Sequence, residues 1–501
     1  MGQLRFVVPQ RDRLPEEALK RVYLSGMEGI PWRCTNSWLD APQDSSQRGF
    51  VVERSVPDSG NLFVPWNVGG REIMLSTATL MEREQPYNLP VELARGLLNR
   101  LRNQSADWQM IGLTLPSEFL VSLRDASRSF VQATTASATE EAAAACAEQA
   151  IRQAMTSLDS LVSGYISQAV AARQQQSAQL PTLFGVQLCH RKLVDAETAL
   201  LPAALNTVSV SVCWRDLEKT AGKKEWQTLD EQIEWCREAG FRIIGGPLLQ
   251  LQDRDVPDWL YLWEDDFDQV QSYVIQHIRS IVKRFRGKVH IWNCAARINV
   301  PDALSLGEEQ KLRLVVNAIE EVRREDPSTP LILGVDRPWA EHLASEDLDL
   351  SPLHFADSLL RADLGIAGIG LEVNLGYWPD GTLPRDLLEF SRMLDRWSLL
   401  DIPLIIYLTV PSDVEPPDGA LGSTIVPLSS FAGGATLETQ KVETQDLVQL
   451  MLAKHFVQGV IWNQLCDADD PRYAHSGLFD TQFRPKPIIE ALTSIRKQHL
   501  N

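Results

Sequence analysis

Residues 277–297 read HIRSIVKRFRGKVHIWNCAAR, a stretch in which a helical pattern passes directly into an apolar run of strand length, KVHIWNCA. Seven similar runs lie elsewhere between residues 180 and 465, and amphipathic segments separate them. They are TLFGVQL, NTVSVSV, FRIIGGPLL, LILGVD, IAGIGLEVN, PLIIYLTV and QGVIWNQL. Eight strands alternating with helices predict a parallel (β/α)8 TIM barrel of the α/β class, whereas six or seven strands would favour an open doubly wound sheet.

The chain before this region has a different character. Residues 1–87 contain short apolar runs broken by turn-forming residues, which predicts a small β-rich domain. Residues 88–178 change to helical spacing and end in one or two long alanine-rich helices, which predicts a helical segment. We therefore expect an N-terminal β-plus-helical accessory domain, followed by the barrel over residues 179–501.

Composition and charge argue against several classes of protein. The 501 residues carry a formal net charge of −18 and no Lys/Arg-rich run, so nucleic acid is not an expected partner. The seven cysteines have no metal-ligand spacing, and neither a metal nor a cofactor is predicted. No signal peptide or transmembrane segment is recognisable, which together with the odd cysteine count favours a cytoplasmic protein without a membrane partner. The oligomeric state is left open by these patterns.

The stretch 277–297 resembles the strand-four pattern of glycoside hydrolase family 10, the endo-β-1,4-xylanases, which reads roughly H-I-x-x-V-x-x-R-Y-K-G-K-V-x-x-W-D-V-V-N-E. Further likenesses follow in order along residues 180–495, among them GIGLEVNL and the terminal GLFDTQFRPKP. The resemblance implies a xylanase-like barrel with a carbohydrate ligand. Positions shared with the family include Gly245, Leu248, Pro257, Trp259, Trp292, Trp462, Asp467, Leu478, Phe479, Asp480, Pro485, Lys486 and Pro487.

The resemblance fails at the positions that carry the family's chemistry. Arg297 stands where the family has its general acid/base Glu, and an arginine does not release its proton near neutral pH. The strand-seven nucleophile falls on Leu408, in an alignment that can shift by one residue, and no acid lies between Asp401 and Asp413. A retaining glycosidase needs both carboxylates. The sequence therefore predicts a degenerate catalytic site.

Other polar and aromatic residues near the expected strand ends remain candidates for the site. Gln250, Glu372 and Asn374 replace a Trp, a Gln and a His of the family. We expect Glu372 to form a charge pair with Arg297 across the barrel mouth, because either charge alone would be costly there. The candidate catalytic residues are Glu372, Asp336 and Asp467, and the candidate substrate-binding residues are Trp462, Arg297, Asn293, Asn374, Tyr407 and Gln250.

Three functions are compatible with these residues. The first is a pseudoenzyme that binds glycan or has a structural role. The second is an active glycoside hydrolase with relocated carboxylates, such as Glu372 with Asp336 or Asp467. The third is a barrel repurposed for other ligands or as a protein-interaction module. A carboxylate pair about 5–10 Å apart that faces an open groove would favour the second function.

Overall fold

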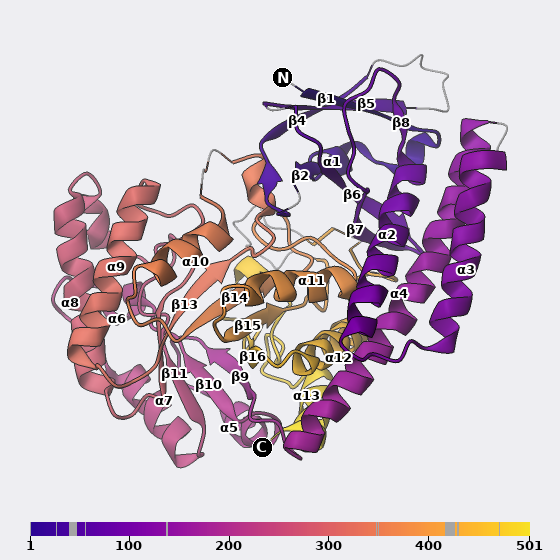
Figure 1. The fold of residues 1–501 in the computed structure, drawn as a ribbon. Helices are drawn as coiled ribbons and strands as arrows, with labels where there is room; N and C mark the ends of the chain where they lie inside the picture. Colours follow the sequence, from indigo (N-terminus) through magenta and orange to yellow (C-terminus); the bar gives the residue numbers. More distant parts are fainter. Residues whose placement is uncertain are drawn as a thin grey trace.

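The computed structural model describes residues 2–26, 28–39, 48–55, 57–136, 139–346, 348, 350–415, 426–427, 430–469 and 471–500. Short N-terminal strands lie at one end of the molecule, three long helices run down one side, and a barrel with its surrounding helices forms the rest (Figure 1). No helix within the described ranges is both long enough and apolar enough to cross a membrane.

The barrel is closed, and its eight parallel strands follow the order β10-β11-β12-β13-β14-β15-β16-β9. Each strand overlaps one of the eight apolar runs of the sequence, so the predicted (β/α)8 TIM barrel is confirmed. The strands are β9 (Leu183–Leu188), β10 (Thr207–Val210), β11 (Arg242–Gly245), β12 (Ile291–Ala295), β13 (Leu331–Asp336), β14 (Gly368–Asn374), β15 (Leu404–Thr409) and β16 (Val457–Trp462).

Helices cover the outside of the barrel and connect its strands (Figure 1). Both faces of each strand are therefore buried, which explains why the strands are almost continuously apolar. Outward-facing strand residues join the helices in the main core, and a separate cluster that includes Ile332, Ile405 and Tyr407 fills the barrel interior. The helices are α5 (Asp195–Ala204), α6 (Trp214–Leu217), α7 (Gln227–Glu238), α8 (Phe267–Phe285), α9 (Glu308–Glu325), α10 (Pro352–Arg361), α11 (Leu387–Ser398), α12 (Leu437–Ala453) and α13 (Ile488–His499).

The N-terminal β unit consists of two four-stranded sheets, with strand orders β4-β5-β1-β8 and β3-β2-β6-β7. Most of its pairings are antiparallel, and aromatic residues such as Phe6 and Phe50, whose ring centres lie 5.0 Å apart, fill its core. Its elements are β1 (Gly2–Val8), α1 (Glu16–Leu19), β2 (Tyr23–Ser25), β3 (Pro31–Trp32), β4 (Cys34–Trp38), β5 (Arg48–Arg54), β6 (Asn61–Val68), β7 (Arg71–Ser76) and β8 (Tyr87–Asn88).

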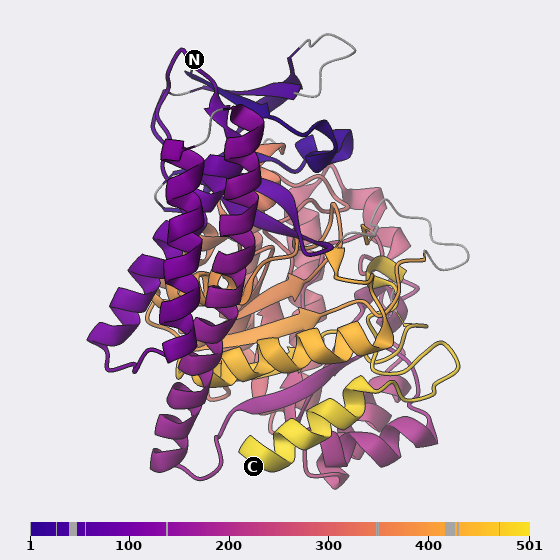
Figure 2. The same ribbon diagram turned by 90° about the vertical axis from the view of Figure 1, so that its right-hand side faces the viewer.

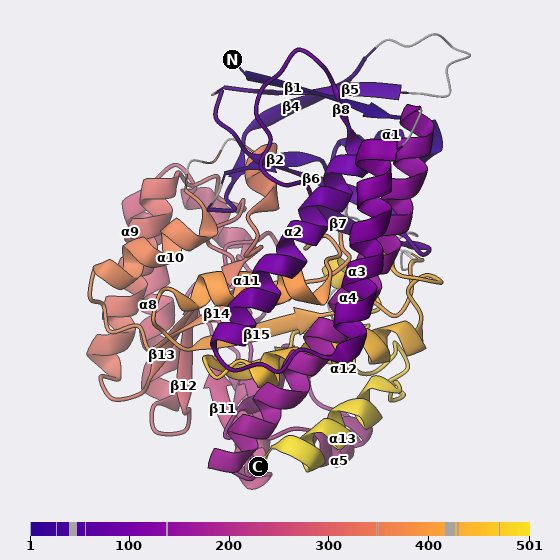
Figure 3. The same cartoon turned by 45° about the vertical axis from the view of Figure 1, so that its right-hand side comes forward.

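Three long helices follow the β unit: α2 (Leu89–Met110), α3 (Ser117–Val131) and α4 (Glu140–Gln176). They lie side by side in both turned views (Figures 2 and 3). The Thr139 hydroxyl accepts a hydrogen bond from the backbone N–H of Ala142 and so caps the start of α4. The alanine-rich segment is one helix from residue 140 onward, and residues 137–138 lie outside the described ranges.

Buried polar contacts attach the N-terminal part to the barrel near the start of α11. Arg100 of α2 bonds the carboxylates of Asp386 and Glu389, each at 3.1 Å. The backbone N–H of Met74 on β7 donates to the carbonyl of Pro384 at 2.9 Å. Because Pro384 lies in the loop between β14 and α11, the N-terminal unit holds a loop that belongs to the barrel mouth.

Candidate functional site

The central feature of the barrel mouth is the ion pair of Arg297, just after β12, with Glu372 on β14. The Nε atom of Arg297 lies 2.8 Å from Oε1 and 2.9 Å from Oε2 of Glu372, and its Nη2 atom also donates to Oε1. The two residues are only 5% and 7% exposed. Burial opposes ionisation of Glu372, but the charge and hydrogen bonds of Arg297 prevail and lower its pKa. The predicted charge pair is confirmed.

Asp336 lies beside this pair, at the end of β13 and in register with Glu372. Its Oδ2 atom is 4.0 Å from Nε of Arg297, and its Oδ1 atom accepts a hydrogen bond from the backbone N–H of Arg337 at 2.8 Å. Burial and the neighbouring charge of Glu372 raise the pKa of Asp336 to about 7. Near neutral pH, Glu372 is therefore ionised while Asp336 is partly protonated.

Two amides complete the surroundings of Glu372. The Nδ2 atoms of Asn374 and Asn463 donate to its Oε1 atom at 3.0 Å and 2.8 Å. Thr409 in turn donates its hydroxyl to Oδ1 of Asn374 at 2.6 Å. Asn374 was a sequence candidate, whereas Asn463 was missed, although it directly follows the last residue of β16, Trp462, and strand ends mark such sites.

The side chains at the end of β15 point alternately into the barrel and away from it. Leu408 is fully buried and packs in the main core outside the barrel, whereas its neighbour Tyr407 belongs to the interior cluster. Side chains alternate along a strand, so Thr409 shares the inward side with Tyr407. The inward-facing residues nearest to the aligned position are therefore Tyr407 and Thr409, each one residue from Leu408. The segment β15 contains no acid at any of these positions.

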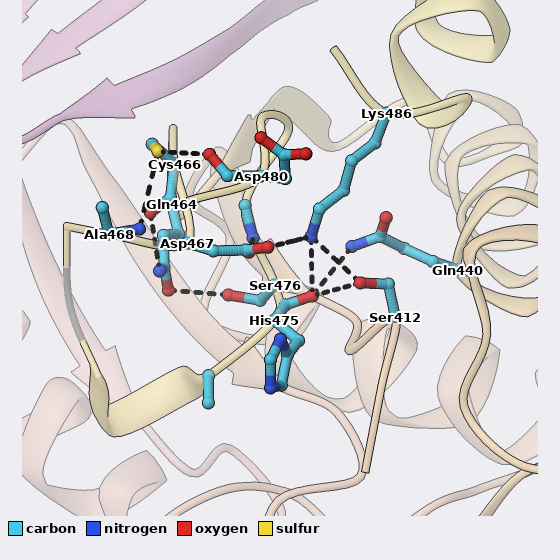
Figure 4. A network of polar contacts seen from close by, with 12 residues as sticks. Ser412, Gln440, Gln464, Cys466, Asp467, Ala468, His475, Ser476, Asp480 and Lys486 are labelled. Atoms are coloured by element: carbon cyan, nitrogen blue, oxygen red, sulfur yellow. Dashed lines mark hydrogen bonds and ion pairs between the residues drawn. The ribbon is translucent and has the colours of Figure 1, made fainter. Parts of the chain in front are cut away.

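Other sequence candidates lie apart from this pair and have structural partners. The carboxylate of Asp467 accepts hydrogen bonds from Nζ of Lys486 and from the backbone N–H of Gly477, both at 2.8 Å, within the polar network of the last loop (Figure 4). The indole of Trp462 is 3% exposed and donates to the carbonyl of Ser476 at 2.8 Å. In this arrangement neither side chain faces an open site.

Asn293 and Tyr407 contact each other inside the barrel. The Nδ2 atom of Asn293 donates to the Tyr407 hydroxyl at 3.4 Å, and the two residues are 1% and 4% exposed. Burial raises the pKa of Tyr407 to about 12, so its hydroxyl stays protonated near neutral pH. The pair lies beneath the mouth and has no direct access to solvent.

A pocket of about 460 Å³ opens at the mouth on the side of β9 to β12 and β16. Gln187, Ser211 and Gln250 line it, and their side chains make no hydrogen bond to any part of the chain that the structure describes. Arg297 and Asn463 also line the pocket, but Glu372, Asp336 and Asp467 do not. Charged residues that were not predicted from the sequence also line it: Arg215, Asp216, Arg254, Asp255, Asp469 and Arg472.

Tyr473 closes the pocket on the side of β14. Its ring centre is 5.2 Å from the guanidinium carbon of Arg297, and its hydroxyl donates to the carbonyl of Asp380 at 3.1 Å. Beside it, the hydroxyl of Tyr377 donates to the carbonyl of Ala474 at 2.6 Å. The loops that follow β14 and β16 are therefore tied to each other across the mouth. Among the described residues, no three His, Cys, Asp or Glu side chains gather as a group able to hold a metal ion.

Comparison with known proteins points to one family. Residues 171–306 match the model of glycosyl hydrolase family 10. The chain is similar to endo-1,4-beta-xylanase 3 of Hypocrea jecorina, with 23% identity over 320 residues, which cover 60% of this chain and 78% of that protein. It also matches endo-1,4-beta-xylanase C of Paenibacillus barcinonensis, with 26% identity over 107 residues, 20% of this chain and 10% of that protein.

A similar solved structure is xylanase 10B from Thermotoga maritima, with 17% identity and a TM-score of 0.49, covering 65% of this chain and 98% of that chain. The N-terminal 170 residues lie outside the family match, which begins at residue 171. The family model and the xylanase relatives confirm the resemblance of this barrel to glycosyl hydrolase family 10.

Proposed function

We propose that the barrel is a non-hydrolytic relative of the family-10 xylanases and binds carbohydrate at its mouth. The buried ion pair of Arg297 with Glu372 is the observation that carries this proposal. A retaining hydrolase needs one free carboxylate as nucleophile and a second as proton donor. Here Glu372 accepts hydrogen bonds on both oxygens. Arg297 lines the pocket and Glu372 does not, so Arg297 lies between Glu372 and the pocket.

Carbohydrate is the ligand class that the relatives and the pocket support. The relatives named above are endo-1,4-beta-xylanases. The pocket volume of about 460 Å³ lies within the usual range for small-molecule sites, roughly 300–1,000 Å³. Amide and hydroxyl groups of Gln187, Ser211 and Gln250 offer both donors and acceptors, which the hydroxyl groups of a sugar require.

A second candidate function, glycoside hydrolysis with relocated carboxylates, has one observation in its favour. Asp336, whose pKa is about 7, lies next to the ionised Glu372. Two carboxyl groups whose pKa values are driven apart are typical of an acid and base pair. Against this candidate, both groups are less than 10% exposed and neither lines the pocket.

Hydrolysis assays on β-1,4-xylan and an aryl xyloside separate the two candidates. We expect the wild-type protein to release no product above background, because a missing general acid alone reduces the rate by ~10²–10⁴-fold. Turnover that is abolished by Asp336→Asn or Glu372→Gln would overturn the proposed function and establish the relocated site. Equal turnover in the wild type and both variants would indicate a contaminating enzyme, which repurification or a second expression host would identify.

Binding assays test the non-catalytic part of the proposal. In titrations with xylo-oligosaccharides, Gln250→Ala should weaken binding by roughly 3- to 10-fold, the effect of one hydrogen bond worth about 0.5–1.5 kcal/mol. Gln109→Ala, on an exposed part of α2, is the matched control and should bind like the wild type. An absence of saccharide binding by the wild type would refute the proposal.

We also propose the cytoplasm as the location of the protein, which the seven free cysteines support. Residues 1–87, 88–178 and 179–501 are proposed as its β-rich, helical and barrel parts. The first two parts contribute the contacts of Met74 and Arg100 to the barrel, so we assign them a supporting role at the mouth.

A further inference from the structure

We infer that the mouth pocket receives the end of a carbohydrate chain and excludes internal segments of a polymer; this inference rests on the proposed function. An internal segment must enter the mouth on one side and leave on the other. The residues that line the pocket come only from the end of β9 and from the segments that follow β9, β10, β11, β12 and β16, including α6. Within the described ranges, the loops after β13, β14 and β15 contribute none.

The inner wall of the pocket is built from the buried side chains of Arg297 and Tyr473, which contact each other and are held by bonds to neighbouring residues. Arg297 forms the lower part of this wall, and its guanidinium is fixed by both oxygens of Glu372. Tyr473 forms the upper part, because its ring lies over that guanidinium and its hydroxyl is bonded to the carbonyl of Asp380. Arg337 reinforces the contact through its own bond to the Asp380 carboxylate at 3.0 Å. A saccharide chain cannot pass this wall without breaking these bonds.

The N-terminal β unit supports the wall from behind. The loop between β14 and α11, which contains Asp380, continues to Leu383, and Leu383 packs in one cluster with Tyr23, Phe63 and Met74. A hydrogen bond of 2.8 Å joins Arg385 to the hydroxyl of Tyr23, and Glu341 accepts a further bond from Arg385. The loop is therefore clamped between the barrel and the N-terminal unit, and it does not form an open flap.

The charges of the pocket favour a neutral sugar over an acidic one. Arg297 is neutralised by Glu372, and Arg215 forms an ion pair with Asp258. Arg472 lies 3.7 Å from the carboxylate of Asp255. These arginines already have carboxylate partners, so an acidic sugar would have to displace a protein carboxylate. A neutral chain end can use the unpaired amide and hydroxyl groups instead.

A stoichiometry experiment with β-1,4-xylan tests the inference. Equal masses of intact xylan and of xylan shortened by limited digestion differ in the number of chain ends but contain nearly the same total number of xylose units. Binding capacity of the full-length protein should rise in proportion to the number of ends. Beyond the length that fills the pocket, xylo-oligosaccharides should show affinities that change by less than about twofold per added unit.

Three outcomes are distinguishable in this experiment. Binding capacity that follows the number of chain ends supports the inference. Ser211→Trp fills the pocket and should abolish this binding. Leu399→Trp, the control at a site 82% exposed just after α11, should leave it unchanged. Capacity that follows total mass, with affinity rising through xylohexaose, overturns the inference but leaves the proposed function intact. No binding of any xylo-oligosaccharide overturns both.

A second variant tests the wall directly. Tyr473→Ala removes the ring above Arg297 and the bond to Asp380. If this wall blocks passage, the variant should gain capacity for intact xylan, and its binding capacity should no longer follow the number of chain ends. Circular dichroism identifies a variant that fails to fold; Tyr473→Phe, which removes only the hydroxyl bond, then serves as the milder substitution. Unchanged chain-end dependence in a folded Tyr473→Ala protein would show that the wall does not set the specificity.

Discussion

Replacing Arg297 with methionine is the most direct test of the reasoning about the mouth. The substitution removes the guanidinium but keeps an unbranched apolar side chain. Glu372, which is 7% exposed in the wild type, is then left beside Asp336 without its cation. The amides of Asn374 and Asn463 still donate to it, so it is left with two hydrogen bonds but no opposite charge.

The expected cost follows from these contacts. Removing one partner of a buried ion pair typically destabilises a protein by ~3–5 kcal/mol, and the two remaining amide donors place this case near ~3 kcal/mol. The double change Arg297→Met with Glu372→Gln removes both charges and keeps an oxygen acceptor for the amides. It should therefore cost only ~1 kcal/mol, which makes the double variant more stable than the single one.

The pH dependence of the single variant has a definite sign. In the wild type the pKa of Glu372 is lowered, so its contribution to stability is present above the unfolded-state pKa and is lost as the pH falls through the folded-state pKa. Without Arg297, burial and Asp336 raise the Glu372 pKa above its unfolded value. The folded variant then takes up a proton, and its deficit relative to the wild type should shrink from about pH 8 to about pH 5.

Urea unfolding followed by tryptophan fluorescence at both pH values measures these free energies. Arg361→Met is the matched control, because it breaks an exposed pair with Asp357, four residues earlier on α10, and such pairs contribute about 0.5 kcal/mol or less. The reasoning is refuted if Arg297→Met is no more costly than this control. It is equally refuted if the double variant is as unstable as Arg297→Met alone.

Three further predictions concern other parts of the molecule. The folded-state pKa of Asp336, about 7, exceeds its ordinary value of 3.8, so this group should lower wild-type stability by up to ~4 kcal/mol as the pH rises from about 4 to about 8. Asp336→Asn should abolish that slope in urea titrations, and an unchanged slope would contradict the assignment. Arg297→Glu combined with Thr409→Glu restores two inward carboxylates but not the family's sugar-positioning residues, so xylan hydrolysis should stay roughly 100-fold or more below an efficient enzyme; rapid hydrolysis would show that the positioning groups survive. Arg100→Met should cost ~3–5 kcal/mol and make the junction of α2 with α11 sensitive to protease, and resistance equal to the wild type would argue against an anchoring role.

The barrel and its central ion pair could be predicted from the sequence because both depend on short-range patterns. Strands buried on two faces leave continuous apolar runs, and eight such runs fix the barrel. Residues at the ends of parallel strands meet at one mouth, which is why Arg297 and Glu372 could be paired before their contact was seen. The side of β15 on which Leu408 lies could not be predicted, because a continuously apolar strand does not reveal which side chains point inward.

The closure of the mouth could not be predicted, because it depends on contacts between distant segments. Tyr473 ends a single short 3-10 turn (Pro471–Tyr473) after β16, and only the folded chain brings it next to Arg297 and Asp380. The pairing within the N-terminal sheets could not be predicted for the same reason. Strand β1 pairs with β5, forty or more residues further along the chain, and no local pattern specifies that partner. Loops and long-range pairings therefore determine whether the barrel mouth forms a pocket or an open groove.

The arginine at position 297 and the glutamate at position 372, which both depart from the family pattern, stabilise each other at the mouth. An arginine at position 297 with a neutral glutamine at 372 would be a buried cation with only Asp336, 4.0 Å away, as its counterion. A glutamate at 372 without the arginine would place two carboxylates at one register position of adjacent strands. Each single change costs several kcal/mol, whereas the pair satisfies both charges. In the proposed non-hydrolytic function, Glu372 serves as the counterion of Arg297, so it is not free to attack a sugar.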